Sequence, residues 1–398
     1  MSEPSSQALE GIRVLEVAGS MSAYVGRLMA GMGADVILIE PPEGNAQRRL
    51  GPYIGNTPGV ERSLTHNYYN AGKRSVTIDL DTPEGQSLFK KMAEKANLVI
   101  DSEPAGVMKA RGLDYESLKK VNGALVCTSI TPYGSEGPYA NYPAADLNLL
   151  AMGGLLALGG YADAEPTRPY GDQALLAASQ FAAIGTMLAV LDAEASGQGQ
   201  FVDVSAQEAV TMTLQHAIQY WDLEKVERTR VTASAGGGSA GSGTYKCKDG
   251  EINVGAFRRW DALVAWMEES GVARAEELTE ERWKDREFLA TPEAKKIFGE
   301  IFSEFAMAHT KRELYEGGME RSISLVPINS PADVVASEQL EFRHYWEKLP
   351  HATLNQELVM PGGPFQFSKT PWKIDRPAPA LGAHTAEVLK ELGISANA

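Results

Sequence analysis

Near the start of the sequence a strand, a helix and a second strand follow one another, and this order restricts the fold more than any other feature. Ile12–Val17 reads IRVLEV, a short apolar run rich in β-branched residues, and Asp35–Glu40 reads DVILIE. Between them, the apolar positions of Ser20–Met32 recur at helical spacing until Gly33. A βαβ unit of this kind joins two parallel strands by a right-handed crossover. The sequence therefore predicts an α/β protein with a parallel sheet.

Further elements continue the same pattern. Thr82–Glu84 combines an N-cap residue, a first-turn proline and a first-turn acid, which predicts a helix to about Ala96. Leu98–Asp101 and Leu125–Ile130 are apolar and short, and we expect them to be the next strands. Together these elements predict that the first half of the chain is α/β.

A glycine- and serine-rich stretch, AGGGSAGSG at 235–243, is the clearest change of composition in the chain. Beyond it, Thr244–Cys247 and Glu251–Val254 flank a Lys-Asp-Gly turn, which predicts a β-hairpin. Charged, helical sequence fills Arg258–Gly317. We therefore predict a small second domain over 226–325.

The charge balance and the spacing of the potential metal ligands narrow the choice of partners. Asp and Glu number 52 against 37 Lys and Arg, a net charge of -15, which repels nucleic acid and anionic membranes. Neither is expected as a partner. Cys127 and Cys247 have no CxxC spacing and the histidines form no HExxH pair, so no metal site is expected. The opening residues lack the pattern of a secretory signal, and we expect a cytoplasmic protein.

The common nucleotide-binding motifs are missing from the sequence. The turn after the first strand, Ala18–Ala23, has one glycine where a dinucleotide fold needs GxGxxG, and no GxxxxGK[ST] occurs. Nicotinamide, flavin and P-loop enzymes are therefore not expected. Lys73 and Arg74 stand directly before the apolar run Val76–Leu80 and can neutralise a phosphate there, although a lone Lys-Arg pair is also common in solvated loops.

Several longer segments, in order along nearly the whole chain, carry a family resemblance. They read GIRVLEVAGSMSAYVGRLMAGMGADVILIEPPEG, NAGKRSVTIDLDTPEG, GVMKARGLDYESL, SITPYGSEGPYANYPAADLNLLAMGGLLALGG, ASGQGQFVDVSAQEAV and RPAPALGAHTAEVLKELGIS. The chain resembles the class III CoA-transferases, a family that includes formyl-CoA transferase, carnitine CoA-transferase and α-methylacyl-CoA racemase.

The resemblance implies an architecture and a substrate. It implies a large Rossmann-like domain made of both chain ends, 1–225 and 326–398, with a small α+β domain inserted at 226–325. It also implies two interlocked subunits, with the long apolar helix predicted over Ala174–Ala195 close to their contact. It also implies coenzyme A or acyl-CoA as a substrate, with no permanently bound cofactor, at the carboxyl edge of the sheet and near Asn70, Lys73 and Arg74. A glycine loop is expected to shield the acyl thioester intermediate from water, because hydrolysis competes with transfer. Its match here is Gly236, Gly237 and Gly238.

The resemblance also implies an aspartate nucleophile, and here the sequence departs from the family. The carboxylate of this aspartate attacks the acyl-CoA, an anhydride forms, and the CoA thiolate returns to give an aspartyl thioester that passes CoA to the acceptor. Alignment without a gap places Leu175 at the nucleophile position, and leucine cannot perform this step. Asp172 is the alternative nucleophile, but it requires a three-residue insertion that rotates the following helix by about 300°. Asp172 can equally be the N-cap of that helix.

Two further departures concern other positions of the family. The racemase branch needs a His-Asp pair where this chain has Ala145 and Asp146, so racemase activity is not expected and Asp146 is predicted to be structural. Glu40 precedes Pro41, where a basic residue is common, and we expect its carboxylate to oppose a phosphorylated ligand by charge repulsion.

A chain that keeps the family's segments but lacks its nucleophile resembles the non-catalytic subunit of a heteromeric class III CoA-transferase. Succinyl-CoA:benzylsuccinate CoA-transferase is such a heteromeric member, so succinyl-CoA is a candidate donor, benzylsuccinate a candidate acceptor, and a homologous catalytic subunit the expected partner. Two alternatives stay open. One is an active homodimer with Asp172 as nucleophile, and the other is a catalytically silent CoA-binding scaffold.

Overall fold

The computed structural model describes residues 7–230, 238–256, 258–351 and 356–394 of the chain. They form two compact units. The first contains Met1–Leu156, Pro169–Asp222 and Glu341–Ala398, and the second contains Ala157–Arg168 and Leu223–Leu340. The range 226–325, predicted for an inserted domain, lies inside the second unit.

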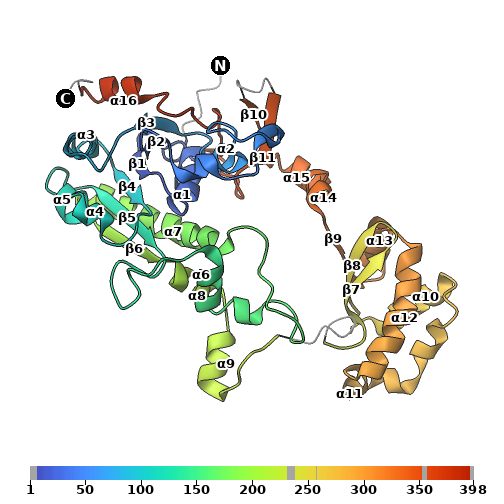
Figure 1. Cartoon of the computed structure of the whole chain (residues 1–398). Helices are drawn as coiled ribbons and strands as arrows, with labels where there is room; N and C mark the ends of the chain where they lie inside the picture. The colour runs from blue at the N-terminus through green and yellow to red at the C-terminus, as the bar shows by residue number, and fades with distance from the viewer. Residues whose placement is uncertain (1–6, 231–237, 257, 352–355, 395–398) are drawn as a thin grey trace. The chain divides into compact units, whose positions relative to one another are not determined.

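A six-stranded parallel sheet forms the centre of the first unit, in the order β3-β2-β1-β4-β5-β6 (Figure 1). Its strands are β1 Arg13–Val17, β2 Asp35–Glu40, β3 Arg74–Thr77, β4 Leu98–Asp101, β5 Val126–Thr131 and β6 Phe201–Ser205. This is the strand order of the Rossmann fold. The predicted α/β class and parallel sheet are confirmed.

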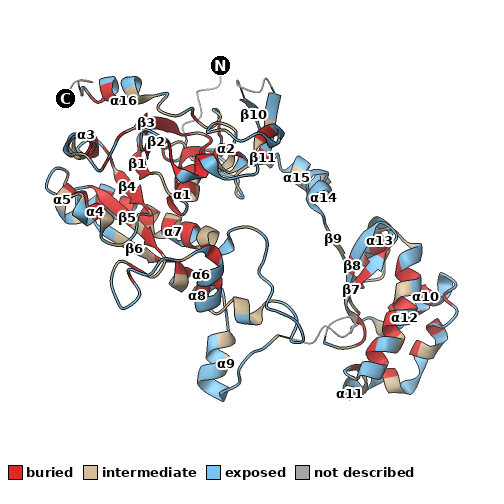
Figure 2. Cartoon of the chain, in the orientation of Figure 1, coloured by how far each residue is buried: buried red, intermediate tan, exposed pale blue. Residues whose placement is uncertain are grey.

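Helices cover both faces of this sheet and give the unit two hydrophobic layers. One layer packs against α1 Ser22–Gly31, α6 Asp146–Met152, α7 Gln173–Ser196 and α8 Ala206–Met212. The opposite layer packs against α3 Pro83–Ala93, α4 Val107–Ala110, α5 Tyr115–Leu118 and α16 Thr385–Glu391. Figure 2 shows β1 to β5 largely buried and the outward sides of the helices exposed, while the edge strand β6 is only partly covered.

Local sequence signals explain where these helices begin and end. At the start of α3, the Thr82 hydroxyl accepts a hydrogen bond from the Gly85 N–H at 3.1 Å, and Pro83 occupies the first turn, as predicted. After α1, Gly33 has a φ of 99°, which lets the chain turn sharply into β2.

The longest helix, α7, is long and apolar enough to cross a membrane by length and composition alone. Small residues form its buried side, among them Ala174, Ala178 and Ala182, and they let it approach β5 and β6 closely. This packing is that of a core helix. Its outward side is also apolar, since Ile184, Leu188 and Leu191 are 59%, 63% and 64% exposed.

Irregular segments complete the first unit. The chain between β2 and β3 forms two short 3-10 helices, η1 Ala46–Arg49 and η2 Ile54–Asn56, and α2 Leu64–Tyr69. An antiparallel pair, β10 Trp346–His351 and β11 Gln356–Pro361, contributes Leu349 and Met360 to a small core around Ala71.

The second unit has an α+β arrangement. It contains an antiparallel sheet of β7 Ser242–Cys247, β8 Gly250–Gly255 and β9 Ser324–Ile328, so the predicted hairpin is confirmed. The helices packed around its aromatic-rich core are α10 Trp260–Glu269, η4 Ala275–Thr279, η5 Glu281–Lys284, α11 Arg286–Leu289, α12 Pro292–Ala308 and α13 Lys311–Glu320. The connecting segments carry η3 Leu156–Leu158, α9 Ala217–Glu224, α14 Pro331–Val335 and α15 Glu338–Phe342.

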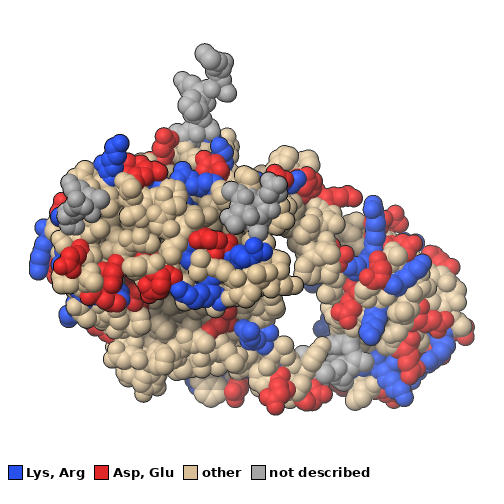
Figure 3. Space-filling view, turned by 45° about the horizontal axis from the view of Figure 1, so that its top comes forward, with Lys and Arg blue, Asp and Glu red and all other residues tan. Residues whose placement is uncertain are grey.

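Charged side chains of both signs are interspersed on the face drawn in Figure 3. Neither sign forms a continuous field on that face. The net charge of -15 is therefore not gathered into one acidic patch there.

Candidate active site

The carboxyl ends of β1 and β4 mark the point where the strand order reverses, and open α/β sheets bind ligands outside such a point. Gly19 follows β1 and Ser102 follows β4. A Cβ added at Gly19 would lie 2.0 Å from the Ser102 Oγ, so a larger residue would force that hydroxyl to move where the two strand ends approach. The single glycine of this turn therefore serves close packing.

A small pocket lies beside this point, between the start of α7 and the chain that connects β2 to β3. Its volume is about 30 Å³, close to that of one water molecule. It is lined by Ser20, Gln47, Leu50, Thr65, Tyr69, Asp172, Leu175, Leu176 and Ser179. Both candidate positions for the nucleophile, Asp172 and Leu175, thus line one pocket.

Leu175 lies in the first turn of α7, where its half-buried side chain packs against the core. The N–H groups of Ala174 and Leu175 donate to Asp146 Oδ1 at 2.7 and 3.3 Å. The Asp146 carboxylate, at the start of α6, thus satisfies two of the free donors of α7, where negative charge also interacts well with the helix dipole. Asp146 has the structural role predicted for it.

Asp172 stands at the N-cap position of α7, and its side chain is exposed. It accepts no capping hydrogen bond from the residues that the structure describes, because Asp146 serves that function. The charge of Asp172 also affects Tyr69. Burial is the main cause that raises the pKa of Tyr69 to about 12, and interactions with Tyr68 and then with Asp172 raise it further. Asp172 is therefore a solvent-accessible carboxylate at the pocket.

The capping arrangement predicts different effects for the two aspartates. Asp146→Ala should lower the free energy of unfolding by about 1 to 2 kcal/mol, because two N–H groups at the start of α7 lose their acceptor. Asp172→Ala is the matched control and should change it by less than about 0.5 kcal/mol. Urea unfolding followed by circular dichroism measures both. Equal losses would contradict the assignment of Asp146 as the cap.

A chain of buried polar groups links the sheet to this pocket. Lys73 Nζ lies 2.7 Å from Glu16 Oε2 and donates to Asn70 Oδ1 and to the Ala23 carbonyl, each at 2.9 Å. The Asn70 amide in turn donates to Gln47 Oε1 at 3.3 Å, and Gln47 lines the pocket. Asn70 and Lys73 are therefore brought together, as the motif suggested. Their predicted proximity to CoA stays a prediction.

Arg74 points away from Lys73, toward the C-terminal helix. Its guanidinium contacts Asp35 at 2.7 Å, Glu391 at 2.9 Å and Glu387 at 3.1 Å. Although burial opposes the charge, hydrogen bonding to Asp35 and Glu391 raises the pKa of Arg74 above its usual value. Its contact with a CoA phosphate also stays a prediction, and the structure gives it three carboxylate partners.

The Glu40 carboxylate is bound inside the protein. Its carboxylate is fully buried and receives Arg48 Nε and Nη2 at 2.7 Å each, Asn45 Nδ2 at 2.7 Å and Ser75 Oγ at 2.7 Å. Burial favours the neutral form, but the bonds from Arg48 lower the pKa of Glu40 overall. The Glu40 charge is thus paired inside the protein, although Arg48 also contacts Glu61 at 2.9 Å. The predicted repulsion of a phosphorylated ligand stays a prediction.

The predicted flap falls largely outside the described residues. Gly236 and Gly237 are not among them, and Gly238 is exposed at the start of the segment that leads into β7. Among the residues from 7 to 394 that are described, no group of His, Cys, Asp and Glu is placed to hold a metal ion.

Several residues of the pocket belong to no motif that could be recognised in the sequence. Gln47, Thr65 and Tyr69 come from the long β2–β3 connection and match no motif. Only the folding of that connection against α7 places them at the site.

Comparison with protein families gives one match that spans most of the chain. The model of CoA-transferase family III matches residues 9–385. The chain belongs to this family. Class III CoA-transferases act on acyl-CoA, which agrees with the substrate class predicted from the sequence.

Individual relatives cover the chain almost completely. It is 37% identical over 397 residues to succinyl-CoA:(R)-benzylsuccinate CoA-transferase subunit BbsE of Thauera aromatica, covering 98% of this chain and 95% of that one. It is 30% identical to succinate–glutarate CoA-transferase of Agrobacterium fabrum, covering 96% and 95%. A crystal structure of a CAIB/BAIF family protein from Brucella suis superposes with a TM-score of 0.87 at 27% identity, covering 97% of this chain and all of that one.

Proposed function

We propose that this chain is the subunit without a nucleophile in a heteromeric class III CoA-transferase. The whole enzyme would move CoA from succinyl-CoA to a dicarboxylic acid, with benzylsuccinate as the leading acceptor, in the cytoplasm. The observation that carries this proposal is the near full-length similarity to a relative named as one subunit of such an enzyme.

The pocket at the start of α7 supports the proposal that this chain has no nucleophile of its own. The first turn of this helix is where the gapless alignment expects the carboxylate, and there the chain presents the apolar side chain of Leu175. An alkyl group can neither attack a thioester nor carry CoA as an acyl thioester. The homologous partner would supply that carboxylate from its own α7.

The outward side of α7 supports the proposal that this chain binds a partner subunit. Phe181, Ile184, Leu188 and Leu191 follow one another at intervals of three and four residues and are 37% to 64% exposed. This spacing places them on one stripe of the helix. A continuous apolar stripe on the surface of a helix is typical of a protein interface. We propose that the homologous catalytic subunit covers it.

A panel of acceptors tests the substrate proposal. The chain is produced together with its homologous catalytic subunit, and succinyl-CoA is offered with benzylsuccinate, methylsuccinate, glutarate, malate or benzoate. We expect new CoA thioesters with the dicarboxylates, most with benzylsuccinate, and none with benzoate. Liquid chromatography with mass spectrometry identifies the products. An assembly that forms no thioester from any dicarboxylate would contradict the proposal.

A homodimeric transferase with Asp172 as nucleophile is the second candidate. The specific observation in its favour is that the exposed Asp172 carboxylate lines the same pocket as Leu175. It predicts that the isolated chain forms a CoA adduct of its own, that this adduct maps to Asp172, and that Asp172→Asn removes it. Intact-mass measurement after incubation with succinyl-CoA distinguishes the two candidates.

A further inference from the structure

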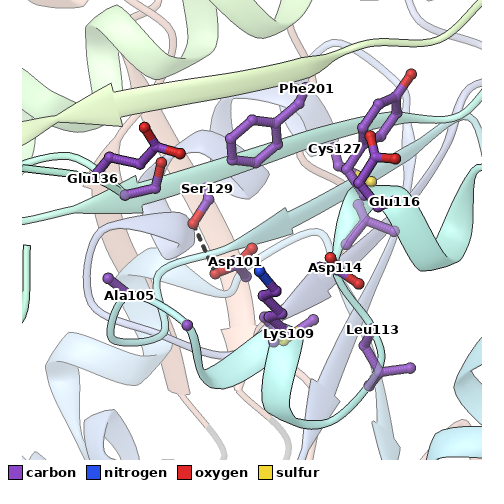
Figure 4. A pocket seen from close by; sticks show the side chains of 15 residues that line it. Asp101, Ala105, Lys109, Leu113, Asp114, Glu116, Cys127, Ser129, Glu136 and Phe201 are labelled. Atoms are coloured by element: carbon purple, nitrogen blue, oxygen red, sulfur yellow. Dashed lines mark hydrogen bonds between the residues drawn. The ribbon is translucent and has the colours of Figure 1, made fainter.

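A larger cavity lies on the face of the sheet opposite to α7. Val99 of β4 and Cys127 of β5 belong to the hydrophobic layer on the α3 side, and Asp101 and Ser129 follow them by two residues, so their side chains share that face. These four residues line a cavity of about 430 Å³ (Figure 4). This volume suits a small organic molecule.

The walls of the cavity are apolar and include two aromatic rings. Met108 and Leu113 line it together with Val99. The ring of Tyr115 stacks on that of Phe201, with centroids 6.3 Å apart and planes inclined by 26°. The Tyr115 hydroxyl donates to the Gly199 carbonyl at 2.7 Å, which holds the ring in place. Such a wall favours a flat, apolar body.

A nearly buried carboxyl group forms the polar end of the cavity. Asp101 is 7% exposed, and its Oδ1 accepts hydrogen bonds from Ser129 Oγ and from the Glu103 N–H, both at 3.2 Å. Figure 4 shows Asp101, Ser129 and Phe201 directed toward the cavity. No hydrogen bond from the described residues reaches Oδ2 of Asp101. Oδ2 is therefore available to accept a hydrogen bond from a donor on a ligand in the cavity.

The remaining charges around the cavity are mostly negative. The lining contains one cation, Lys109, and three acids besides Asp101, which are Asp114, Glu116 and Glu136. This balance disfavours carboxylates and phosphates and favours cations or neutral donors. The cavity therefore differs in charge preference from a site for dicarboxylates or for the phosphates of CoA.

We propose that this cavity binds a planar ring bearing an amino or ammonium group, with the ring against Phe201 and Tyr115 and the nitrogen donating to Asp101. The site is independent of the proposed transferase activity, because it lies across the sheet from Leu175 and Asp172. An aryl ammonium ion and an amino-substituted nucleobase share this chemistry, and they serve as separate probes.

Titration calorimetry of the full chain tests the proposal with benzylamine and adenosine. The matched controls are benzoate, which replaces the ammonium by a carboxylate, and purine riboside, which lacks the amino group. We expect at least one amino ligand to bind at least tenfold more tightly than its control. Binding of benzylamine alone indicates an ammonium ligand, and binding of adenosine alone indicates a nucleobase. No binding by either, or equal binding by the controls, would overturn the proposal.

Three variants locate the binding. Phe201→Ala and Asp101→Asn should each weaken the bound probe about tenfold or more. Phe367→Ala is the matched control, because Phe367 is 41% exposed against 42% for Phe201 and lies outside the cavity lining. It should leave the affinity unchanged. Unchanged affinity in both cavity variants would place the ligand elsewhere and overturn the proposal.

The pH dependence supplies an independent readout. Burial raises the pKa of Asp101 to about 7. The other ionisable groups around it are Glu103, Lys109, Arg111, Asp114, Tyr115, Glu116, Cys127 and Glu136. Below pH 7 the Asp101 carboxyl group is mainly neutral, so benzylamine should bind more tightly at pH 8 than at pH 6, and Asp101→Asn should remove this difference. A flat profile in the wild-type chain would contradict the pairing with Asp101.

The same shift provides a folding control for the Asn variant. Because the pKa of Asp101 is raised from 3.8 to about 7 in the folded chain, the unfolded chain releases this proton first, and stability falls as pH rises through that window. Asp101→Asn lacks this loss. It should therefore unfold at a higher temperature than the wild-type chain at pH 8, and a variant that does so is folded and fit for the binding measurement.

Discussion

Mixed with its homologous catalytic subunit, this chain should transfer CoA from succinyl-CoA at least about a thousandfold faster than it does alone. Removal of a covalent nucleophile costs enzymes about four to six orders of magnitude in turnover, and the isolated chain presents Leu175 where the family expects that group. The measurement is succinate release in the presence of a dicarboxylate acceptor, with each subunit alone and with the two combined.

Asp172→Asn in the combined assembly is the control for this experiment. It removes the only carboxylate that lines the α7 pocket among the described residues, and turnover should stay within about twofold. Activity of the isolated chain that disappears in Asp172→Asn would support the homodimer instead. Tight CoA binding without exchange, alone or combined, would favour the silent scaffold.

Lys73→Met should lower the free energy of unfolding by about 3 to 5 kcal/mol, the usual cost of breaking a buried ion pair from one side. Both Lys73 and Glu16 are fully buried, and the ammonium group forms an ion pair with Glu16 at 2.7 Å and donates hydrogen bonds to Asn70 and to the Ala23 carbonyl. Burial lowers the pKa of Lys73 and raises that of Glu16, and each partner opposes the shift of the other. Methionine fills the space of the lysine side chain but leaves the Glu16 carboxylate buried without its cation.

The double variant Lys73→Met/Glu16→Gln provides the matched control. It removes both charges, so it should recover most of the stability that the single variant loses. Hydrogen exchange of peptides covering β1 and β3 assigns the loss to the first unit. A Lys73→Met chain with wild-type stability and weakened CoA binding would show that the residue serves the ligand, as the sequence suggested, rather than the fold.

The architecture was largely predictable, because the signals that specify it are local. The apolar runs of β1 and β2, the glycine after α1 and the Thr-Pro-Glu start of α3 each act over a few residues. The hairpin of β7 and β8 follows from its turn residues in the same way. Local signals of this kind agree with one another and leave few topologies open.

The site was less predictable, because its residues meet only after the chain has folded. The interpretation of Asp172 as a capping residue was right in position, but the carboxylate that caps α7 belongs to Asp146 in another helix. Gln47 and Tyr69 reach the pocket from a connection without a motif. No spacing rule relates these positions.

By itself the sequence determined the α/β class, the parallel sheet and the membership in a CoA-transferase family. Periodicity, turn residues and long segments that occur in the order typical of the family can all be read along the chain. Only the tertiary structure decided which groups each charged side chain pairs with. Glu40 pairs with Arg48, which also contacts Glu61, and Arg74 reaches Glu387 and Glu391 at the other end of the sequence. The physical reason is that the energy of a charge depends on its burial and on the groups within a few ångströms, and folding sets both.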